Sequence, residues 1–370
     1  MSDLEADAIE VLGLLRRHLN VLISGPPATG KTALLSKVAE LFRGIPTVPP
    51  HDKGAAVPIP KAGAVSAAFP WLPSPSCSSR QVFRTVFHQN SKYRDFVSGL
   101  MPDLDEPGAF STSIGVLLRA NLFASESDGT ALIIIDEINR GPAVQLFGGA
   151  IVSMERDKRG DSEGDPTPST VTFDALMNEG IEEIALSGDL YILGAMNQAD
   201  TSVEALDVAF LRRWESFRVE PSSNVLMIYL GVAESGDEPP ATPETAADVY
   251  RVAIYAWQAI NDRIAVGRGP EYRLGHGVFM AEPVADTVIG AAEHISRAWA
   301  KVQAHIDEIF FGDARGVAAV LNLLSGPNPV ASYETILFGD EPREIVTSPS
   351  PIPVANLYEY LFAVAKDGTA

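Results

Sequence analysis

A glycine-rich loop near the start of the chain has the residue types and spacing that bind a phosphate chain. The stretch GPPATGKT over residues 25–32 fits the pattern GxxxxGK[ST]. Backbone N–H groups of such a loop surround the phosphates, and the helix that follows adds the positive end of its dipole. We expect Lys31 to reach the β- and γ-phosphates and the Thr32 hydroxyl to ligate Mg²⁺. The nucleotide-binding candidates are therefore Gly25, Pro26, Pro27, Ala28, Thr29, Gly30, Lys31, Thr32 and Ala33.

Two adjacent carboxylates form the second group that could do chemistry. Asp136 and Glu137 follow the apolar run 131–135, and ligands of open α/β sheets bind at the carboxyl ends of the strands. Asp136 can hold Mg²⁺ through its water shell, and Glu137 can act as the general base that polarises the attacking water. Together with the phosphate-binding loop upstream, these carboxylates predict a nucleoside triphosphatase that uses Mg²⁺.

Both motifs need strands and helices to position them. Residues 21–24 predict a short buried strand before the loop, and residues 32–42 predict a helix after it. Residues 131–136 are the most apolar run and predict a central parallel strand, and residues 191–197 predict another buried strand. Alternation of strands and helices to about residue 220 indicates a three-layer α/β domain. Further predicted elements are a strand at 81–88, helices at 4–19, 91–100, 111–124 and 141–156, and a turn or loop at 157–170.

The second half of the chain has a different pattern. It is helical, most clearly at 248–265 and 286–310. We therefore predict an α/β nucleotide-binding domain over residues 1–222 and an α-helical domain over residues 223–370. Within the first domain, the proline-rich stretch 45–80 is expected to be an irregular insertion or loop.

The composition excludes several classes of protein. The chain has 370 residues and a net charge of −20, and so acidic a surface repels a phosphate backbone unless basic residues gather locally. We therefore expect DNA to be contacted indirectly, through a complex. Cys77 is the only cysteine, so no intrachain disulfide can form. An acidic, amphipathic N-terminus and the lack of an apolar run of about 18 residues predict a cytoplasmic protein without a membrane span.

Four stretches follow one another in a distinctive order. They are FHQNSKYRDFVSGLMP (87–102), DEINR (136–140), GAMNQADTSVEALDVAFLRRWESFRVEP (194–221) and YRLGHGVFM (272–280). Together they resemble the AAA+ module of the McrB GTPase, within the wider MoxR-like branch, over most of residues 20–280. The MNxxD element within the third stretch is typical of the McrB group. The resemblance implies a three-layer P-loop AAA+ domain with a parallel sheet, followed by a smaller α-helical lid domain.

The resemblance also assigns roles to residues of the third stretch. Asn197 stands where the family has its sensor-one residue, whose amide can orient the lytic water beside the γ-phosphate. Asp200 in the same element either fixes the loop, assists the nucleotide site or caps a helix. Arg213 is the first candidate, and Arg212 the second, for the arginine that enters a neighbouring subunit's active site and offsets phosphoryl charge. The family's arginine run is longer, since Leu211 occupies one of its positions here.

The lid segment supplies the remaining candidates. Arg273 precedes Gly275 and His276 and is the candidate sensor-two cation, with Arg268 nearby as an alternative. By the same resemblance, we expect His276 to be structural rather than catalytic.

Two functions remain open on the sequence. The first is a ring-forming motor subunit, hexameric by resemblance, of a McrBC-like DNA restriction or defence complex with a McrC-like partner. The second is a MoxR-like remodelling chaperone ATPase that matures a partner protein complex. The MNQAD and FHQ segments favour the first, whereas the acidic charge and the lack of a DNA-reading module before the loop keep the second open. Phosphate chemistry is shared by ATP and GTP, and no guanine-reading NKxD element is present. The McrB resemblance implies GTP and the wider superfamily implies ATP, so both substrates stay open.

Overall fold

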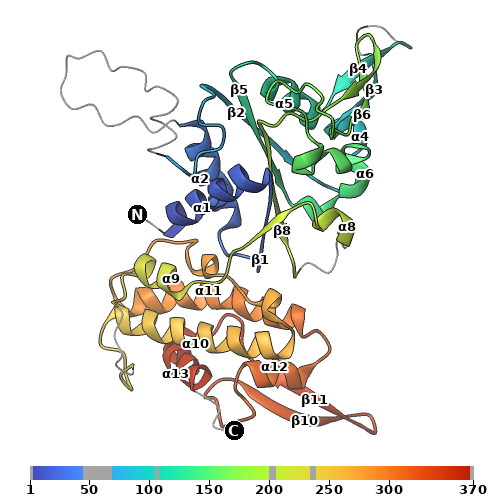
Figure 1. Cartoon of the computed structure of the whole chain (residues 1–370). Coiled ribbons are helices and arrows are strands. Elements are labelled where there is room, and N and C mark those ends of the chain that lie inside the picture. The colour runs from blue at the N-terminus through green and yellow to red at the C-terminus, as the bar shows by residue number, and fades with distance from the viewer. Residues whose placement is uncertain are drawn as a thin grey trace, which may run out of the picture. The chain divides into compact units, whose positions relative to one another are not determined.

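The chain forms two compact units in the computed structural model (Figure 1). The first unit comprises Met1–Ser24 and Lys31–Arg218, and the second comprises Gly25–Gly30 and Val219–Ala370. The phosphate-binding loop is thus divided along the chain, since its first six residues group with the second unit. The structure describes residues 3–44, 69–103, 105, 108–199, 206–233 and 239–366, so most of the expected insertion at 45–80, and Asp200, lie outside the described residues.

A five-stranded sheet forms the centre of the first unit (Figure 1). Its strands are β1 (Asn20–Gly25), β2 (Ser79–Val86), β5 (Gly129–Asp136), β8 (Leu190–Asn197) and β9 (Glu215–Arg218). The strand order is β2-β5-β8-β1-β9, and the pairs β2–β5, β5–β8 and β1–β9 are parallel. Strand β5 is buried over almost its whole length, as a strand covered by helices on both faces must be. The predicted α/β fold is confirmed.

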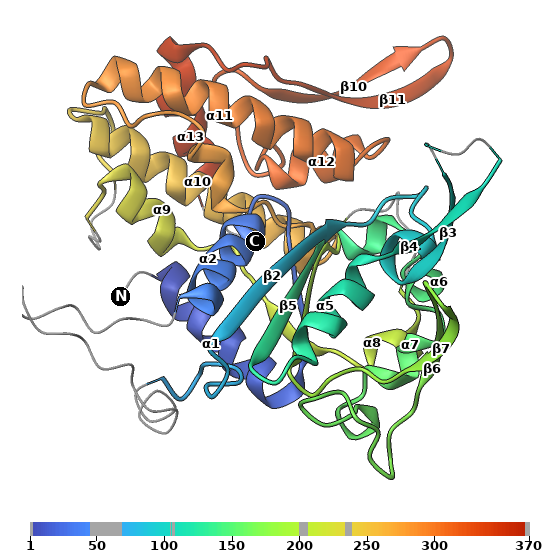
Figure 2. The same ribbon diagram turned by 90° about the horizontal axis from the view of Figure 1, so that it is seen from above.

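Helices cover both faces of this sheet (Figure 2). Helices α1 (Asp3–His18) and α2 (Lys31–Arg43) lie together on one face, and α5 (Val116–Ala124) lies on the other. Each presents its apolar side chains to the sheet, as the helical spacing of the apolar residues predicts. Helix α2 begins at the lysine of the phosphate-binding loop, so β1, the loop and α2 follow in the order that such a loop requires.

A cluster of aromatic rings fixes the segment that carries the two candidate arginines. Phe147 makes edge-to-face contacts with Phe210 and Trp214, at centroid distances of 5.3 and 6.2 Å. Phe87 and Phe96 extend the cluster. Such aromatic pairs each contribute roughly 0.5–1.5 kcal/mol beyond the burial of their area. Because Phe210 and Trp214 flank Arg212 and Arg213, the turn between α8 (Val208–Leu211) and β9 is held on both sides.

Several predicted helices of the first unit are wrong or too long. The segment 91–100 forms only α4 (Tyr93–Phe96) and then enters strand β3 (Ser98–Pro102). The first part of 111–124 is strand β4 (Phe110–Ile114), which pairs with β3. A Cβ at Gly115 would lie 2.3 Å from the Phe96 carbonyl carbon, so a glycine allows the chain to pass there before α5 begins.

Two further differences from the prediction lie between residues 141 and 184, and the first again involves a glycine. The predicted helix 141–156 is divided into α6 (Ala143–Phe147) and α7 (Ala150–Ser153). Gly148 between them has φ = +51°, and a Cβ there would meet the Tyr93 ring at 2.6 Å. An unpredicted hairpin is formed by β6 (Phe173–Met177) and β7 (Gly180–Ile184).

The second unit is mainly helical around a separate apolar core. Its two longest helices, α10 and α11, begin at hydroxyl caps: the Thr245 side chain accepts from the N–H of Asp248, and Thr287 accepts from Gly290. Trp257 and Trp299 are fully buried between the helices. Among the described residues, no helix is long and apolar enough to cross a membrane. The helices are α9 (Ser223–Leu230), α10 (Ala246–Gly267), α11 (Val288–Ile309), α12 (Ala314–Val320) and α13 (Val354–Ala365).

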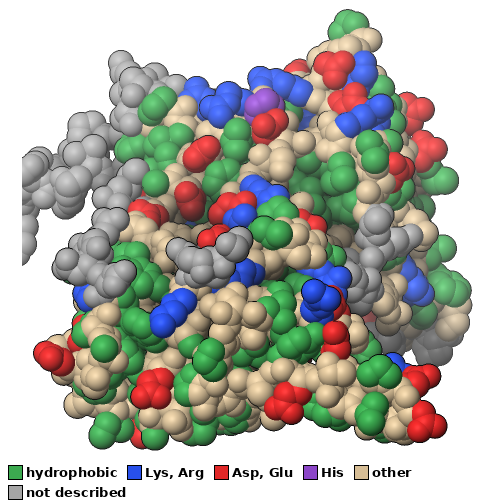
Figure 3. Space-filling view, turned by 90° about the horizontal axis from the view of Figure 1, so that it is seen from below, with side chains coloured by type: hydrophobic (Ala, Val, Ile, Leu, Met, Phe, Trp, Pro, Cys, Tyr) green, Lys and Arg blue, Asp and Glu red, His purple; other side chains and the backbone are tan. Residues whose placement is uncertain are grey.

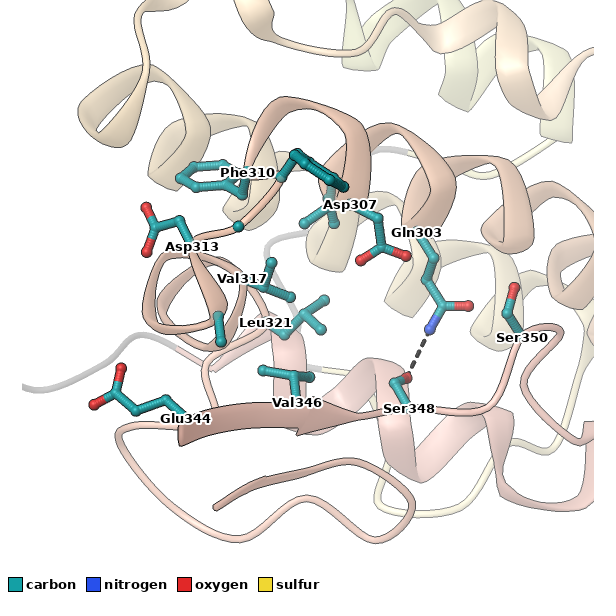
Figure 4. A pocket seen from close by; sticks show the side chains of 14 residues that line it. Gln303, Asp307, Phe310, Asp313, Val317, Leu321, Glu344, Val346, Ser348 and Ser350 are labelled. Atoms are coloured by element: carbon teal, nitrogen blue, oxygen red, sulfur yellow. Dashed lines mark hydrogen bonds between the residues drawn. The ribbon is translucent and has the colours of Figure 1, made fainter. Parts of the chain in front are cut away.

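A hairpin of β10 (Ser332–Phe338) and β11 (Glu341–Thr347) departs from the all-helical prediction for this unit. Strand β11 packs against α12 and leaves a hollow of about 350 Å³ beside α11 (Figure 4). The hollow has an apolar floor with Val317, Leu321 and Val346, and Gln303 donates to the Ser348 hydroxyl at its rim over 2.7 Å. The helical prediction for the second unit rested on residues 248–265 and 286–310, and residues 332–347 do not continue that helical pattern.

A buried arginine ties three elements of the first unit together. Arg159 is 2% exposed, and its guanidinium donates to Asn20 Oδ1 (2.7 Å), to the Met154 carbonyl (3.2 Å) and to the Leu190 carbonyl. These acceptors lie on β1, at the end of α7 and on β8. Burial lowers the pKa of Arg159 to about 9, so the guanidinium is charged at neutral pH and its charge is offset by carbonyl and amide dipoles.

Replacing Arg159 with methionine should therefore destabilise the first unit by more than about 3 kcal/mol, because several buried acceptors lose their donor at once. Urea unfolding followed by fluorescence measures the loss. Arg343→Met, in the exposed β10–β11 hairpin, is the matched control and should change stability by less than about 0.5 kcal/mol. Equal unfolding midpoints for the two variants would contradict the structural role given to Arg159.

Candidate nucleotide site

The phosphate-binding loop has a backbone conformation that its sequence makes possible. Gly30 has φ = +86° and Ala28 has φ = +58°, so the chain turns twice within the loop. The Thr29 hydroxyl donates to the Pro26 carbonyl over 2.9 Å and closes the turn from within. A Cβ at Gly25 would lie 2.2 Å from the Val219 carbonyl oxygen, so only glycine fits where β1 leaves the sheet.

Lys31 stands at the first position of α2 and is buried. Burial lowers its pKa to about 8, and the charges of Glu137 and Asp136 oppose that shift. The lysine therefore lies within electrostatic reach of both strand-end carboxylates, as the two sequence motifs predict. A bound phosphate would add negative charge and stabilise the ammonium form further.

Glu137 is held in an uncommon conformation at the end of β5. It is a non-glycine residue with φ = +51° and ψ = +46°, in the left-handed region. Its N–H donates to the Asp136 Oδ1 over 3.0 Å. The carboxylate accepts from Asn197 Nδ2 at Oε1 (2.9 Å) and from Arg140 Nε at Oε2 (3.0 Å). Each carboxylate oxygen accepts one hydrogen bond from the described residues and has two lone pairs, so a lone pair on each is left for a water molecule.

Asn139 is a positioning residue that the sequence motifs alone do not single out. Its Nδ2 donates to the Asn197 carbonyl over 3.0 Å, so it holds the end of β8 beside the end of β5. Asn139 is 6% exposed, and its Oδ1 has no hydrogen-bond partner among the described residues. Its place inside the DEINR stretch, two residues after Glu137, is the signal that could have identified it.

The donor set of Thr32 and Asp136 fits a magnesium ion. A hydroxyl and a carboxylate are hard oxygen ligands, and Mg²⁺ usually keeps several waters and phosphate oxygens beside one or two protein groups. In the part of the chain that the structure describes, no group of three or more His, Cys, Asp and Glu side chains could enclose a metal ion by itself. The residues therefore suit an ion that arrives with the nucleotide, with Thr32 and Asp136 as its protein ligands.

The two candidate finger arginines differ in exposure. Arg213 has a side chain only 7% exposed, which donates to the Ala209 carbonyl and pairs with Glu155 at 3.0 Å. Arg212 has a side chain 65% exposed and stands 3.8 Å from the same carboxylate. Both lie in a hollow of about 360 Å³ on the first unit, which is lined by His18, Asn20, Glu155, Arg156, Arg212, Arg213, Trp214 and Glu215.

The two lid arginines also differ. Arg268 stacks on the Phe310 ring at 4.5 Å, donates to the Ile309 carbonyl and pairs with Asp313. These contacts hold the Arg268 side chain against the surface of the second unit, near the end of α11. Arg273 pairs with Glu220 at 3.3 Å, with a side chain 30% exposed. Arg273 therefore stays the better sensor-two candidate.

A segment of the second unit is hydrogen-bonded directly to the phosphate-binding loop. The N–H of Gly275 donates to the Pro27 carbonyl over 2.8 Å, and the N–H of Gly277 donates to the Ala28 carbonyl over 2.9 Å. A Cβ at Gly275 would lie 2.1 Å from the Ala28 carbonyl carbon. The two glycines thus allow backbone-to-backbone contact, and the loop carbonyls are satisfied by this segment.

Two components of known restriction enzymes are similar in sequence to part of this chain. The type IV methyl-directed restriction enzyme EcoKMcrB subunit of Escherichia coli (strain K12) is 28% identical over 213 residues, which cover 57% of this chain and 37% of that protein. The type II restriction enzyme BsuMI component YdiS of Bacillus subtilis (strain 168) is 31% identical over 203 residues, which cover 53% of this chain and 55% of that protein. The chain thus spans just over a third and just over half the length of these relatives. No protein-family model matches it.

Among solved structures, a putative ATPase from Cytophaga hutchinsonii is 13% identical, with a TM-score of 0.32 over 86% of this chain and 82% of that chain. PCH-2 of C. elegans is 13% identical, with a TM-score of 0.37 over 82% of this chain and 70% of that chain. These scores are too low to support an argument. The parallel sheet and the loop define the class, a P-loop nucleotide-binding domain. Within that class the chain resembles the McrB group of AAA+ proteins, on its similarity to these two restriction-enzyme components.

Gly275→Ala should lower the affinity for a nucleoside triphosphate at least tenfold, because the new methyl group overlaps the Ala28 peptide and the loop must shift. Titration with fluorescent ATP and GTP analogues measures the affinity. Gly326→Ala is the matched control, since a Cβ there meets nothing within 4 Å, and it should bind as the wild type does. Unchanged affinity in Gly275→Ala would mean that the loop conformation does not depend on this segment.

Proposed function

We propose that this chain hydrolyses ATP or GTP with Mg²⁺ and works as a ring-forming motor subunit of a McrBC-like restriction complex. The observation that best supports the chemistry is the hydrogen bond from the Asn197 amide to the Glu137 carboxylate, 2.9 Å long. A general base must be positioned to within a few tenths of an ångström of the water that it activates. Here the candidate base is held by Asn197, at the end of β8, and by Arg140, three residues farther along the same stretch.

Each residue then has a role that follows from its chemistry. Lys31 offsets charge on the β- and γ-phosphates, and the N–H groups of the loop bind the phosphate oxygens. Thr32 and Asp136 would hold the Mg²⁺, which would neutralise phosphate charge. Glu137 accepts the proton of the attacking water. Asn197 orients the carboxylate of Glu137, and Asn139 orients Asn197.

Assembly into a ring is supported by the exposed guanidinium of Arg212. An arginine that stabilises a transferring phosphoryl group in a neighbouring subunit must reach solvent on its own subunit. Arg212 meets this condition better than Arg213, which was the first candidate on the sequence. In Figure 3, Lys and Arg side chains lie near a histidine at one edge with Asp or Glu side chains among them, and the hollow that contains Arg212 is likewise lined by both arginine and glutamate side chains.

The restriction role is supported by the names of the two relatives. One is a subunit of a type IV restriction enzyme and the other is a component of a type II restriction enzyme. These names favour a restriction complex over a remodelling chaperone. We propose that a McrC-like partner stimulates hydrolysis and that DNA is contacted through the complex.

The first test measures hydrolysis. Purified chain should release phosphate from ATP or GTP in the presence of Mg²⁺. Glu137→Gln should bind the nucleotide but hydrolyse it at least about 100-fold more slowly, because its side chain cannot accept the proton. Lys31→Ala should lose nucleotide binding.

Glu341→Gln, in the exposed β10–β11 hairpin, is the control for removing one carboxylate and should turn over at the wild-type rate. Assays with ATP and with GTP, each with and without a McrC-like partner, identify the nucleotide that is hydrolysed and measure how far the partner stimulates hydrolysis. Wild-type turnover by Glu137→Gln would remove the residue from the role of base. No hydrolysis of either nucleotide under any of these conditions would refute the proposed activity.

The second test asks which arginine acts between subunits. A mixture of Glu137→Gln and Arg212→Ala chains should recover part of the activity that each lacks alone. In a mixed ring, some intact Glu137 sites face an intact Arg212 from the neighbour. A mixture of Glu137→Gln and Arg273→Ala chains should stay inactive, because Arg273 is expected to serve its own subunit's site and no chain then carries both groups.

Arg213→Ala replaces Arg212→Ala in a parallel mixture. Its side chain is buried and paired, so it should lower stability rather than complement. Light scattering must first establish that the variants co-assemble with a non-hydrolysable nucleotide. Equal activity in the Arg212 and Arg273 mixtures would contradict the assignment of at least one of these arginines.

A further inference from the structure

His276 has one ring nitrogen bound and one free to interact with a ligand. It begins the short 3₁₀ helix η4 (His276–Phe279) and is 8% exposed. Its Nδ1 accepts the backbone N–H of Ser222 over 3.2 Å. Because a nitrogen that accepts a hydrogen bond carries no proton, the proton of the neutral ring is on Nε2. Burial lowers the pKa of His276, which keeps the ring neutral near pH 7.

The free nitrogen faces the phosphate-binding loop. Its Nε2 lies 3.8 Å from the position that a Cβ of Gly30 would occupy. The residues on either side, Gly275 and Gly277, are hydrogen-bonded to the loop carbonyls of Pro27 and Ala28. In the part of the chain that the structure describes, no hydrogen bond from Nε2 is found. A buried donor is thus held beside a loop whose function is to collect donors around phosphate.

The bound nitrogen connects the ring to the start of the second unit's helices. Ser222 is the N-cap of α9, where its hydroxyl accepts the N–H of Val225 over 3.2 Å. Its own N–H is the donor to His276. A ligand that binds at Nε2 would therefore be linked through one ring to the N-cap residue of α9.

We propose that His276 donates its Nε2–H to a phosphate oxygen of the bound nucleotide beside Gly30, and so couples phosphate binding to the Ser222 end of α9. The inference rests on the proposed nucleotide-binding function and adds one side-chain donor to the backbone donors of the loop. This role differs from the structural role that we expect for His276 on the sequence. A purely structural His276 would need only its hydrogen bond with Ser222. The two roles use different nitrogens of the same ring, and this makes them separable.

Asparagine and glutamine each reproduce one of these nitrogens. In His276→Asn the side-chain oxygen can replace Nδ1 as the acceptor for Ser222, but no donor reaches the Nε2 position. In His276→Gln the amide can place a donor at the Nε2 position while the Nδ1 acceptor is lost. Fluorescent ATP and GTP analogues serve as the probes for affinity, and thermal unfolding of both variants reports on the Ser222 contact.

We expect His276→Asn to bind the nucleotide roughly tenfold more weakly or worse, with KM for hydrolysis rising in step, as for the loss of a hydrogen bond to a charged group. His276→Gln should bind within about threefold of the wild type, even where its unfolding temperature is lower. The reverse order, or failure of His276→Gln to restore affinity, would overturn the proposal. If the wild type binds and both variants bind equally well, only this inference fails; if the wild type does not bind nucleotide, the proposed function fails instead.

Discussion

The hydrogen bond between Asn197 and Glu137 is the contact on which the arrangement of the candidate site depends. It joins the ends of β8 and β5, and it can form only if these strands are neighbours, run parallel and end at the same level. That register in turn needs the buried isoleucines of β5 to be covered on both faces of the sheet. The packing of the first unit and the position of the candidate base are therefore set by the same strand pair, and Asn139 reinforces it from a third position.

Short sequence motifs identify those parts of the candidate site that are formed by consecutive residues. The loop at 25–33 and the carboxylates at 136 and 137 are recognised by glycine spacing and by an apolar strand that ends in acidic residues. The hairpins β3–β4 and β6–β7 could not be found in this way. Gly115, for example, follows β4 at a point where the carbonyl carbon of Phe96 would lie 2.3 Å from a Cβ. That contact, which requires glycine, exists only in the folded chain.

The candidate arginines illustrate the same limit. A sequence can place two arginines before a tryptophan, but it does not say which one is buried. In the structure, Phe210 and Trp214 insert their rings into the aromatic cluster on either side of the turn. One arginine is thereby directed inward to Glu155 and the Ala209 carbonyl, and Arg212 is left on the surface. Exposure, which decides whether an arginine can act on another subunit, is a product of this packing.

The phosphate-binding loop must satisfy two requirements on its backbone groups at once. A loop that binds phosphate must leave its N–H groups available while its carbonyl groups are satisfied elsewhere, because an unpaired buried carbonyl is costly. The backbone of Gly275 and Gly277 meets this demand by donating to the carbonyls of Pro27 and Ala28. Side chains at either position would prevent the contact, so the glycines are as necessary to the loop as the loop's own glycines are. The nucleotide affinity that we propose for this chain would then depend on two groups of residues about 250 positions apart in the sequence. Only the first group, the loop itself, follows a known phosphate-binding pattern.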